Sequence, residues 1–248
     1  MRKRSLALFV VVLAGCGAQT RPDVAHVLAA KVRHCTDGEV LRLGSAHTAY
    51  AASAPWGAVA FDRPGGAVVA RFGAKNINDY PTVFGVIGAV VRRDCSPRWY
   101  RVQLPKKPNG MTAFVRTRAL RIETVSTRIV IEVSKRRLTL YRSAKPVLTA
   151  TVAVGSPSTP TPTGRFYVNQ RLVPTESGGP FGPGAIGVSA FSNVLTGWTQ
   201  GGPVAIHGTN EPWSIGHAVS NGCIRLPNAT LLRLFRVALA GTPVIIRP

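Results

Sequence analysis

Acidic residues are scarce in this chain of 248 residues, and its second half has almost none. Asp and Glu number 10 against 31 Lys and Arg, which gives a formal net charge of +21. Residues 126–248 contain no Asp, and their only acidic side chains are Glu132, Glu176 and Glu211. A histidine oriented by an Asp within this half is therefore excluded, and a hydrolase that holds its metal through carboxylates is disfavoured. We expect neither a metal nor a cofactor.

Composition also bounds the fold class. Aromatic residues make up only 7% of the chain, but hydrophobic residues make up 45%, and there are 25 Gly and 19 Pro. Disorder requires few apolar residues and collagen requires a strict glycine period, so both classes are excluded. The length allows one or two domains with apolar cores and many turns.

The N-terminus reads as an address rather than as part of a fold. Residues 1–16 have a cationic start, an apolar run and small residues before Cys16, which is typical of a secretory signal and too short to span a bilayer. The ending Leu13-Ala14-Gly15-Cys16 resembles the lipobox of bacterial lipoproteins. This resemblance implies a signal peptide over residues 1–15, a lipid on Cys16 and a tether over residues 16–27. The alternative is an ordinary signal peptide in which Cys16 is incidental.

Because the chain is expected to be exported, its basic charge is expected to meet anions of the cell envelope. Residues 16–125 carry 16 basic and 7 acidic residues, and residues 126–248 carry 12 and 3, so each part is net +9. The charge is spread over the whole surface and lies outside the cytoplasm, so nucleic acid is not an expected partner. The expected location is the outer face of a membrane, facing the cell wall, where anionic cell-wall polymers are candidate partners.

Three cysteines remain beyond Cys16. An oxidising compartment permits a disulfide, and Cys35 and Cys95 both lie in the N-terminal half, so we predict that they pair. The alternative is two separate buried thiols. Cys223 is then the unpaired cysteine of an exported protein and a candidate reactive thiol.

Strand patterns divide the chain into two mainly β domains, residues 28–122 and 126–248. In the first, the pattern around Trp99-Tyr100-Arg101-Val102 and Ala113-Phe114-Val115 resembles bacterial SH3-like domains, which implies a small barrel. In the second, one helix is expected over residues 229–239, with Asn228 as its N-cap and Gly241 as its stop. Strands are predicted over residues 48–52, 67–72, 82–91, 100–104, 112–116, 127–133, 137–141, 147–154, 164–169, 185–188, 204–206 and 243–246.

The chemistry concentrates in one glycine-rich stretch of the second domain. His207 follows a predicted strand, and Cys223 stands sixteen residues later behind Ser220-Asn221-Gly222. A thiol needs a base or a cation to become a nucleophile, and His207 supplies the base if the loop folds back. Backbone N–H groups near Gly222 and Cys223 are candidates for binding an oxyanion. With no Asp available, the carbonyl of Gly208 is the simplest group to orient the imidazole. A zinc site on Cys223, His207 and His217 lacks the paired spacing that zinc ligands show.

The same stretch resembles the catalytic domain of the YkuD-type L,D-transpeptidases of bacterial peptidoglycan. The matching residues are His207-Gly208-Thr209-Asn210, Pro212, Ser214-Ile215-Gly216, Ser220-Asn221-Gly222-Cys223-Ile224-Arg225-Leu226 and Asn228, with 161–166 and 182–187 upstream. Two departures are Asn221, where His or Lys is common, and Thr230, where an Asp often begins the helix.

This resemblance implies a β-rich catalytic domain with one helix beside the active loop, and a role for each matching residue. Cys223 is the acylated nucleophile, His207 is the base, and the Gly208 carbonyl orients the imidazole. The residues that shape the oxyanion and substrate site are Thr209, Ser220, Asn221, Gly222 and Arg225.

The implied substrate is the peptidoglycan stem peptide, which is cross-linked from third residue to third residue through a thioester. Two alternatives stay open. One is an L,D-carboxypeptidase with water as acceptor, and the other is a wall-binding lipoprotein with an inert catalytic-like domain.

Overall fold

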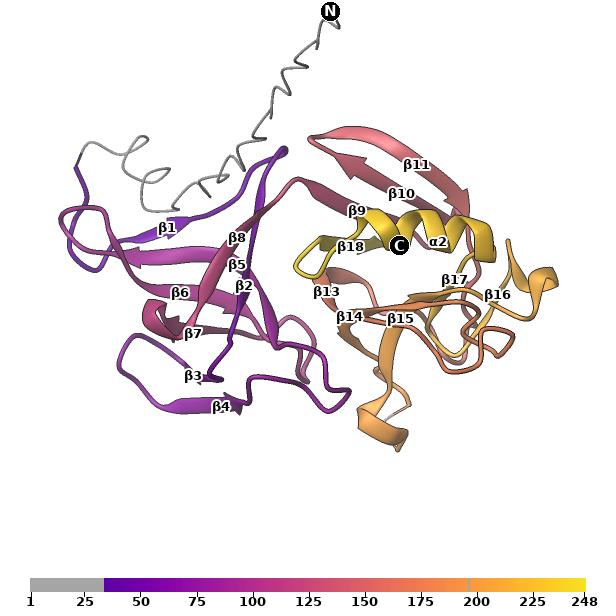
Figure 1. Cartoon of the computed structure of the whole chain (residues 1–248), viewed down its shortest axis with the longest axis horizontal. Coiled ribbons are helices and arrows are strands. Elements are labelled where there is room, and N and C mark those ends of the chain that lie inside the picture. The colour runs from indigo at the N-terminus through magenta and orange to yellow at the C-terminus, as the bar shows by residue number, and fades with distance from the viewer. Residues whose placement is uncertain (1–33, 196) are drawn as a thin grey trace, which may run out of the picture.

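The computed structural model describes residues 34–195 and 197–248, which form two large β-sheets side by side, a two-stranded sheet and one α-helix (Figure 1). The fold is mainly β, as the strand patterns predict. Cys16, the signal peptide and the tether lie outside the described residues. Within the described residues, no helix is both long and apolar enough to cross a membrane.

The first sheet occupies the indigo-to-magenta side of Figure 1 and is antiparallel throughout. Its order is β4-β3-β7-β6-β5-β2-β8, and β1 also pairs with β5. Its strands are β1 (Val40–Arg42), β2 (Ala49–Ser53), β3 (Ala58–Phe61), β4 (Val68–Phe72), β5 (Val83–Val91), β6 (Pro97–Gln103), β7 (Thr112–Arg116) and β8 (Arg121–Val125).

The apolar run of β5 explains its central place in this sheet. Eight of its nine residues are buried, because it pairs with β1, β2 and β6 and its side chains enter the core that contains Phe84, Val102 and Val115. The predicted end of this domain at residue 122 cuts through β8, which pairs with β2 as far as Val125. The short strands β1, β3 and β8 were not predicted. In β3 two of the four residues are alanine, which does not favour strands. The SH3-like assignment stays a prediction.

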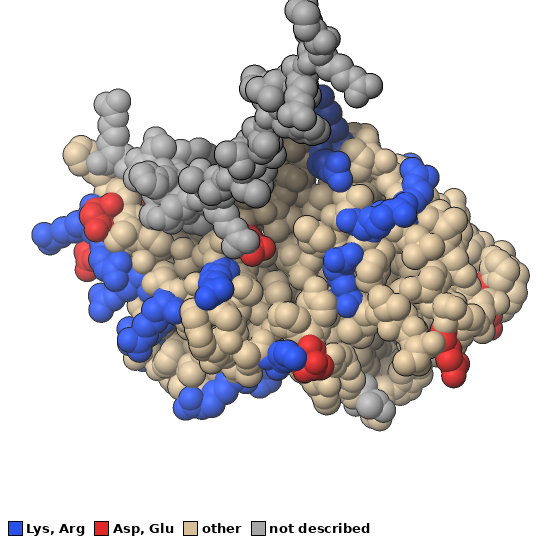
Figure 2. Space-filling view, in the orientation of Figure 1, with Lys and Arg blue, Asp and Glu red and all other residues tan. Residues whose placement is uncertain are grey.

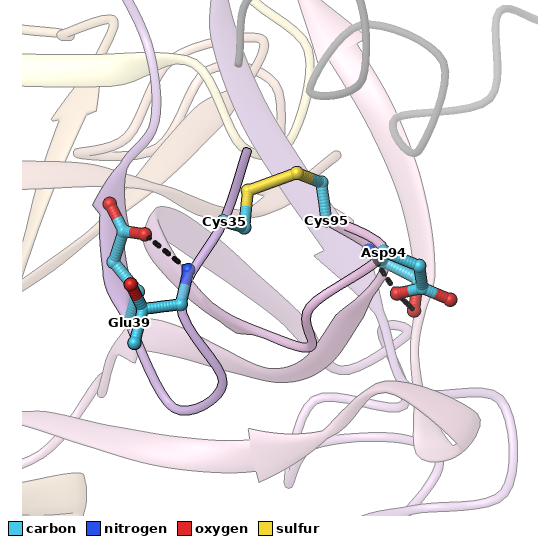
Figure 3. Close-up of a disulfide and its surroundings, with 6 residues drawn as sticks. Cys35, Glu39, Asp94 and Cys95 are labelled. Atoms are coloured by element: carbon cyan, nitrogen blue, oxygen red, sulfur yellow. Dashed lines mark hydrogen bonds between the residues drawn. A yellow bond between two sulfur atoms is a disulfide. The ribbon is translucent and has the colours of Figure 1, made fainter. Parts of the chain in front are cut away.

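A disulfide joins Cys35, ahead of β1, to Cys95 in the turn between β5 and β6 (Figure 3). The two Cα atoms are 5.3 Å apart, and the cysteines are 60 residues apart in the sequence. The cross-link therefore fixes the first described residues of the chain to the middle of the first sheet.

The second sheet has the order β11-β10-β9-β18-β13-β14-β15-β17. Its pairs are antiparallel except for β9–β18 and β15–β17, which are parallel. Its strands are β9 (Thr127–Glu132), β10 (Arg137–Arg142), β11 (Lys145–Thr151), β13 (Gly164–Leu172), β14 (Ala185–Phe191), β15 (Pro203–His207), β17 (Ile224–Arg225) and β18 (Pro243–Arg247). A separate parallel pair joins β12 (Val154–Gly155) to β16 (Ala218–Ser220).

The helix α2 (Asn228–Val237) packs its apolar face on the second sheet. Leu231 and Leu234 are fully buried in the core formed with Ile129, Ile206 and Val244.

The ends of the helix differ from the sequence prediction. Asn228 is the first helical residue and not the N-cap, because its side chain is used by Thr209 instead. The helix ends at Val237, and Gly241 is not its stop. With φ of +88°, Gly241 lies so close to the first sheet that an added Cβ would come within 2.1 Å of the Ala51 Cβ.

The two sheets are joined by packing and by buried hydrogen bonds. The hydroxyl of Tyr167 on β13 donates to the Val83 carbonyl on β5 at 3.0 Å, and Tyr167 is 1% exposed. The Asn109 side chain both accepts from the Phe191 N–H and donates to the Phe191 carbonyl. These contacts fix the position of the second sheet against the first.

Candidate active site

Parallel pairing of β15 with β17 brings the two chemical residues together. The register sets Ile206 opposite Ile224 and His207 opposite Arg225, so Cys223 stands immediately before β17, beside the end of β15. Neighbouring strands lie about 4.8 Å apart, so the fifteen residues between His207 and Cys223 form a loop whose two ends lie side by side. Ile206 and Ile224 are fully buried, and this apolar ladder holds the two segments in register.

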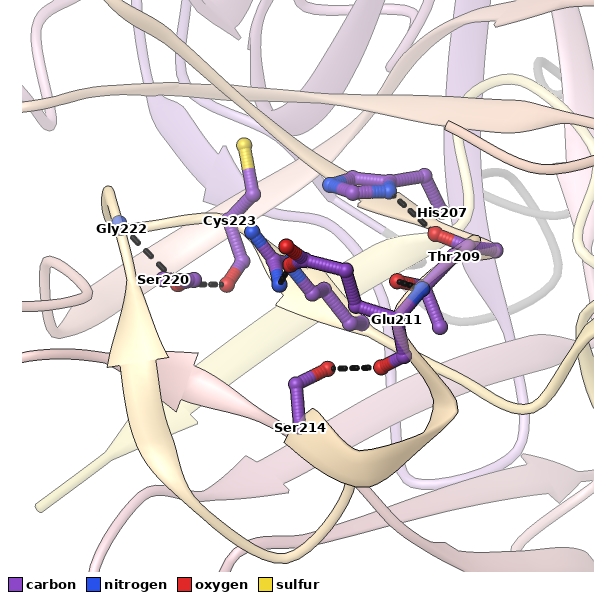
Figure 4. Close-up of polar contacts among 9 residues, drawn as sticks. His207, Thr209, Glu211, Ser214, Ser220, Gly222 and Cys223 are labelled. Atoms are coloured by element: carbon purple, nitrogen blue, oxygen red, sulfur yellow. Dashed lines mark hydrogen bonds and ion pairs between the residues drawn. The ribbon is translucent and has the colours of Figure 1, made fainter. Parts of the chain in front are cut away.

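The imidazole of His207 is buried and oriented by a backbone group. Its Nδ1 lies 2.5 Å from the Gly208 carbonyl oxygen. A carbonyl oxygen can only accept a hydrogen bond, so the neutral ring carries its proton on Nδ1. The free nitrogen, Nε2, is left as the base, and in Figure 4 it is turned toward the side on which the Cys223 sulfur stands. The structure thus gives Gly208 the orienting position that a carboxylate takes in other triads.

The loop that carries Cys223 is held in shape by Ser220. The Ser220 hydroxyl accepts from the Gly222 N–H at 3.2 Å and donates to the Cys223 carbonyl at 2.6 Å (Figure 4). Gly222 has φ of +104°, a conformation that residues with a Cβ rarely adopt. The Thr161 hydroxyl also holds this loop by donating to the Gly222 carbonyl at 3.0 Å. Cys223 is half-buried.

Burial sets the protonation state of both groups. Burial lowers the pKa of His207 from 6.5 to about 4, against the opposing effect of the Gly208 carbonyl, and the Arg225 charge lowers it further. Burial also raises the pKa of the Cys223 thiol, against smaller opposing effects of the Ala205 backbone and Arg225. At neutral pH the pair is therefore a neutral thiol beside a neutral imidazole.

The structure assigns other roles to two residues expected at the substrate. Thr209 is 5% exposed; its hydroxyl accepts from the Glu211 N–H at 2.9 Å, and its N–H donates to Asn228 Oδ1 at 2.8 Å. Thr209 therefore shapes its own turn. The Gly222 N–H is occupied by Ser220, so in this conformation it is not a free oxyanion donor. Asn221 is exposed at the tip of the loop.

Three further residues complete the site: Glu211 and Phe181, which were not predicted there, and Asn228, which was predicted as the helix N-cap. Glu211 forms an ion pair with Arg225, the second residue after Cys223. The ring of Phe181 meets the His207 ring edge-on at 4.9 Å between centroids, although Phe181 is 46% exposed. A Cβ added to Gly182 would come within 2.4 Å of Asn228 Oδ1, and one added to Gly208 within 2.3 Å, so both positions leave room only for glycine. The scarcity of acids in this half was the available signal for Glu211.

Metal chemistry finds no support in the described ranges 34–195 and 197–248, where no three His, Cys, Asp or Glu side chains cluster. His217 is exposed on a turn and does not join His207 and Cys223 in any such group.

Comparison with known proteins agrees with this geometry. The model of the YkuD family, the L,D-transpeptidase catalytic domain, matches residues 126–246. The YkuD protein of Bacillus licheniformis is 40% identical over 126 residues, which cover 51% of this chain and 68% of the relative. The YkuD protein of Bacillus subtilis is 38% identical over 123 residues, with 50% and 67% covered. The chain belongs to the YkuD family of L,D-transpeptidases.

Solved L,D-transpeptidase structures are more distant. The catalytic domain of the Enterococcus faecium L,D-transpeptidase is 23% identical, with 49% of this chain and 96% of that domain covered and a TM-score of 0.36. The L,D-transpeptidase LdtMt1, solved in complex with imipenem, is 17% identical, with 92% and 88% covered and a TM-score of 0.44. The assignment of this transpeptidase to its family rests on the sequence relatives and the family model.

Proposed function

We propose that this L,D-transpeptidase is a cysteine-dependent enzyme that forms cross-links between the third residues of two peptidoglycan stem peptides. The observation that carries the proposal is the pairing of a half-buried Cys223 with a buried, neutral His207 whose Nδ1 is fixed on the Gly208 carbonyl. An inert domain has no need of an imidazole held in one tautomer beside a thiol.

The reaction has two acyl transfers. Cys223 Sγ attacks the carbonyl of the third stem residue while His207 Nε2 takes the thiol proton. The amide bond to the terminal D-amino acid breaks, His207 returns the proton to the leaving amine, and a thioester remains on Cys223. The side-chain amine of a second stem then attacks the thioester, forms the new amide and releases the thiol.

The N–H of Cys223 and the guanidinium of Arg225 are the groups suited to stabilise the charge that develops on the carbonyl oxygen. Among the described residues, the Arg225 Nε has no hydrogen-bond partner although it is buried, and its Nη1 is held by Glu211. A positive group fixed beside the reacting carbonyl lowers the barrier more in a poorly hydrated site than in water. Arg225 also favours the thiolate form of Cys223.

The proposal includes the location of the enzyme. The lipobox around Cys16 and the surplus of basic residues support a lipoprotein that is exported and anchored in a membrane facing the cell wall. Membrane fractionation tests this part: Cys16→Ala is expected to move the protein out of the membrane fraction. An unchanged membrane fraction in that variant would contradict the lipid anchor.

Mass spectrometry of muropeptides tests the reaction. The full chain is incubated with disaccharide–tetrapeptides, and the wild type is expected to give cross-linked dimers and free D-amino acid. Cys223→Ala is expected to give neither, since no acyl-enzyme forms, and Cys95 is no substitute because it is in a disulfide. Dimers produced by Cys223→Ala would refute the thioester. Tripeptides without dimers in the wild type would assign water as the acceptor.

A further inference from the structure

A cleft of about 760 Å³ lies at the junction of the two sheets. The first sheet contributes the turn between β1 and β2 together with parts of β5 and β6, and the second sheet contributes parts of β9, β13 and β18. Its lining contains no residue of the His207–Cys223 loop. From β13 to β17 the sheet runs through three strand spacings, about 15 Å, so the cleft is a separate place on the protein.

Four arginines line this cleft, and no acidic side chain among residues 34–195 and 197–248 does. Arg42 comes from β1, Arg128 from β9, Arg165 from β13 and Arg247 from β18. Ladder register explains why three of them share one face. Arg165 pairs with Ile245, and Ile245 pairs with Val130, so Arg247 and Arg128 lie two residues away on the same face of the sheet. The opposite face, with Ile129, Val244 and Phe166, is the apolar core.

These arginines have no acidic partner among the described residues, which is unusual for four like charges around one cleft. The carboxylate nearest in register is Glu132, opposite Arg247, but it is occupied by Lys135 and Arg137. Arg128 is held in place by donating to the carbonyls of Ser45 and Ala46 at 3.0 and 2.8 Å. Figure 2 shows more Lys and Arg than Asp and Glu side chains on the face that it displays.

We propose that this cleft binds a linear phosphodiester polymer of the cell envelope. The planar guanidinium matches a phosphate in geometry and stays charged at any physiological pH, and four of them around one concave groove fit a chain with repeated negative charges. A bilayer surface is too broad to enter a cleft between two sheets, whereas a single polymer strand enters it. Such binding holds the enzyme along the wall without occupying the thiol site.

Direct binding measurements test the proposal on the full chain carrying Cys223→Ala, so that no turnover intervenes. The probe is a glycerol-phosphate oligomer, and its binding is measured by titration calorimetry at about 0.15 M ionic strength, where the Debye length is about 8 Å. The cleft variant is Arg42→Glu with Arg165→Glu, one exposed arginine from each sheet, and the matched control is Arg98→Glu with Arg233→Glu, also exposed, one in each half and outside the cleft. Both pairs change the net charge equally.

Each guanidinium–phosphate contact in water is worth about fivefold in affinity, so the cleft variant is expected to bind at least about 25-fold more weakly. The control is expected to bind within about threefold of the parent, because long-range attraction is screened. Thermal unfolding checks that both variants fold, and Arg42→Gln with Arg165→Gln replaces the cleft pair if the glutamates destabilise it.

Three outcomes would overturn the proposal. Equal weakening by the cleft and control pairs would show attraction by net charge alone. Equally tight, cleft-dependent binding of poly-L-glutamate would remove the preference for phosphate. Loss of binding to phosphatidylglycerol vesicles in the cleft variant, with oligomer binding unchanged, would assign the arginines to a lipid surface. None of these results depends on whether Cys223 is a catalyst.

Discussion

The buried imidazole of His207 makes the stability of this enzyme depend on pH in a predictable direction. Burial lowers its pKa from 6.5 to about 4 in the folded protein. The unfolded chain therefore binds the proton more tightly, and protonation favours unfolding. The contribution of His207 to stability is complete above about pH 6.5 and is lost as the pH falls toward 4.

The size of this effect follows from the two pKa values. At about 1.4 kcal/mol for each pH unit between 6.5 and 4, the full loss is roughly 3 kcal/mol. Between pH 7 and pH 5 the same relation gives a loss of about 2 kcal/mol. A domain with a free energy of unfolding of about 5–15 kcal/mol registers a loss of this size clearly.

Urea unfolding of the wild type and of His207→Asn at pH 7 and at pH 5 measures the difference. Asn keeps a side-chain N–H for the Gly208 carbonyl but does not titrate, so its loss between the two pH values is expected to be smaller by about 2 kcal/mol. His217→Asn is the matched control, because it removes an exposed imidazole and leaves His207 in place. Equal pH dependence in the wild type and in His207→Asn would refute the reasoning.

Two further predictions concern the first sheet and its junction with the second. Replacing both Cys35 and Cys95 with Ser is expected to lower the free energy of unfolding by about 4 kcal/mol, because the cross-link closes a loop of 60 residues, and denaturant titration with and without reductant checks it. Tyr167→Phe is expected to cost about 1–2 kcal/mol, because the Val83 carbonyl loses its donor at the junction, and a drop in Tm measures it. An unchanged Tm in Tyr167→Phe would show that water replaces the hydroxyl.

The sequence was most informative where one residue type is required by the chemistry. The absence of Asp from residues 126–248 removed the usual histidine partner and left a carbonyl, and the structure sets Gly208 in that position. The importance of Gly222 was also predicted from the sequence, and few residues other than glycine adopt its φ of +104°. The long strand β5 was predicted because a strand that is buried on both faces of a sheet requires an apolar run.

Sequence reasoning failed where a polar side chain has several partners to choose from. Asn228 is a good N-cap by residue type, yet its carboxamide is taken by Thr209 because the turn after β15 packs against the helix start. Thr209 and the Gly222 N–H also form hydrogen bonds inside the site, and their predicted part in shaping the substrate site stays a prediction. Local pattern cannot rank such partners, because the competing groups come from distant segments.

The sequence by itself determined a mainly β protein and its family membership, and it singled out Cys223 and His207 as candidate nucleophile and base, because these inferences depend on residue identity and on periodicity. Tertiary structure alone decided which protonation states the pair adopts, since burial of His207 and Cys223 comes from segments such as Phe181 that lie far away along the chain. It also decided that four arginines from four strands surround one cleft, because strand pairing sets residues 128, 165 and 247 on one face and the junction of the two sheets brings residue 42 to them.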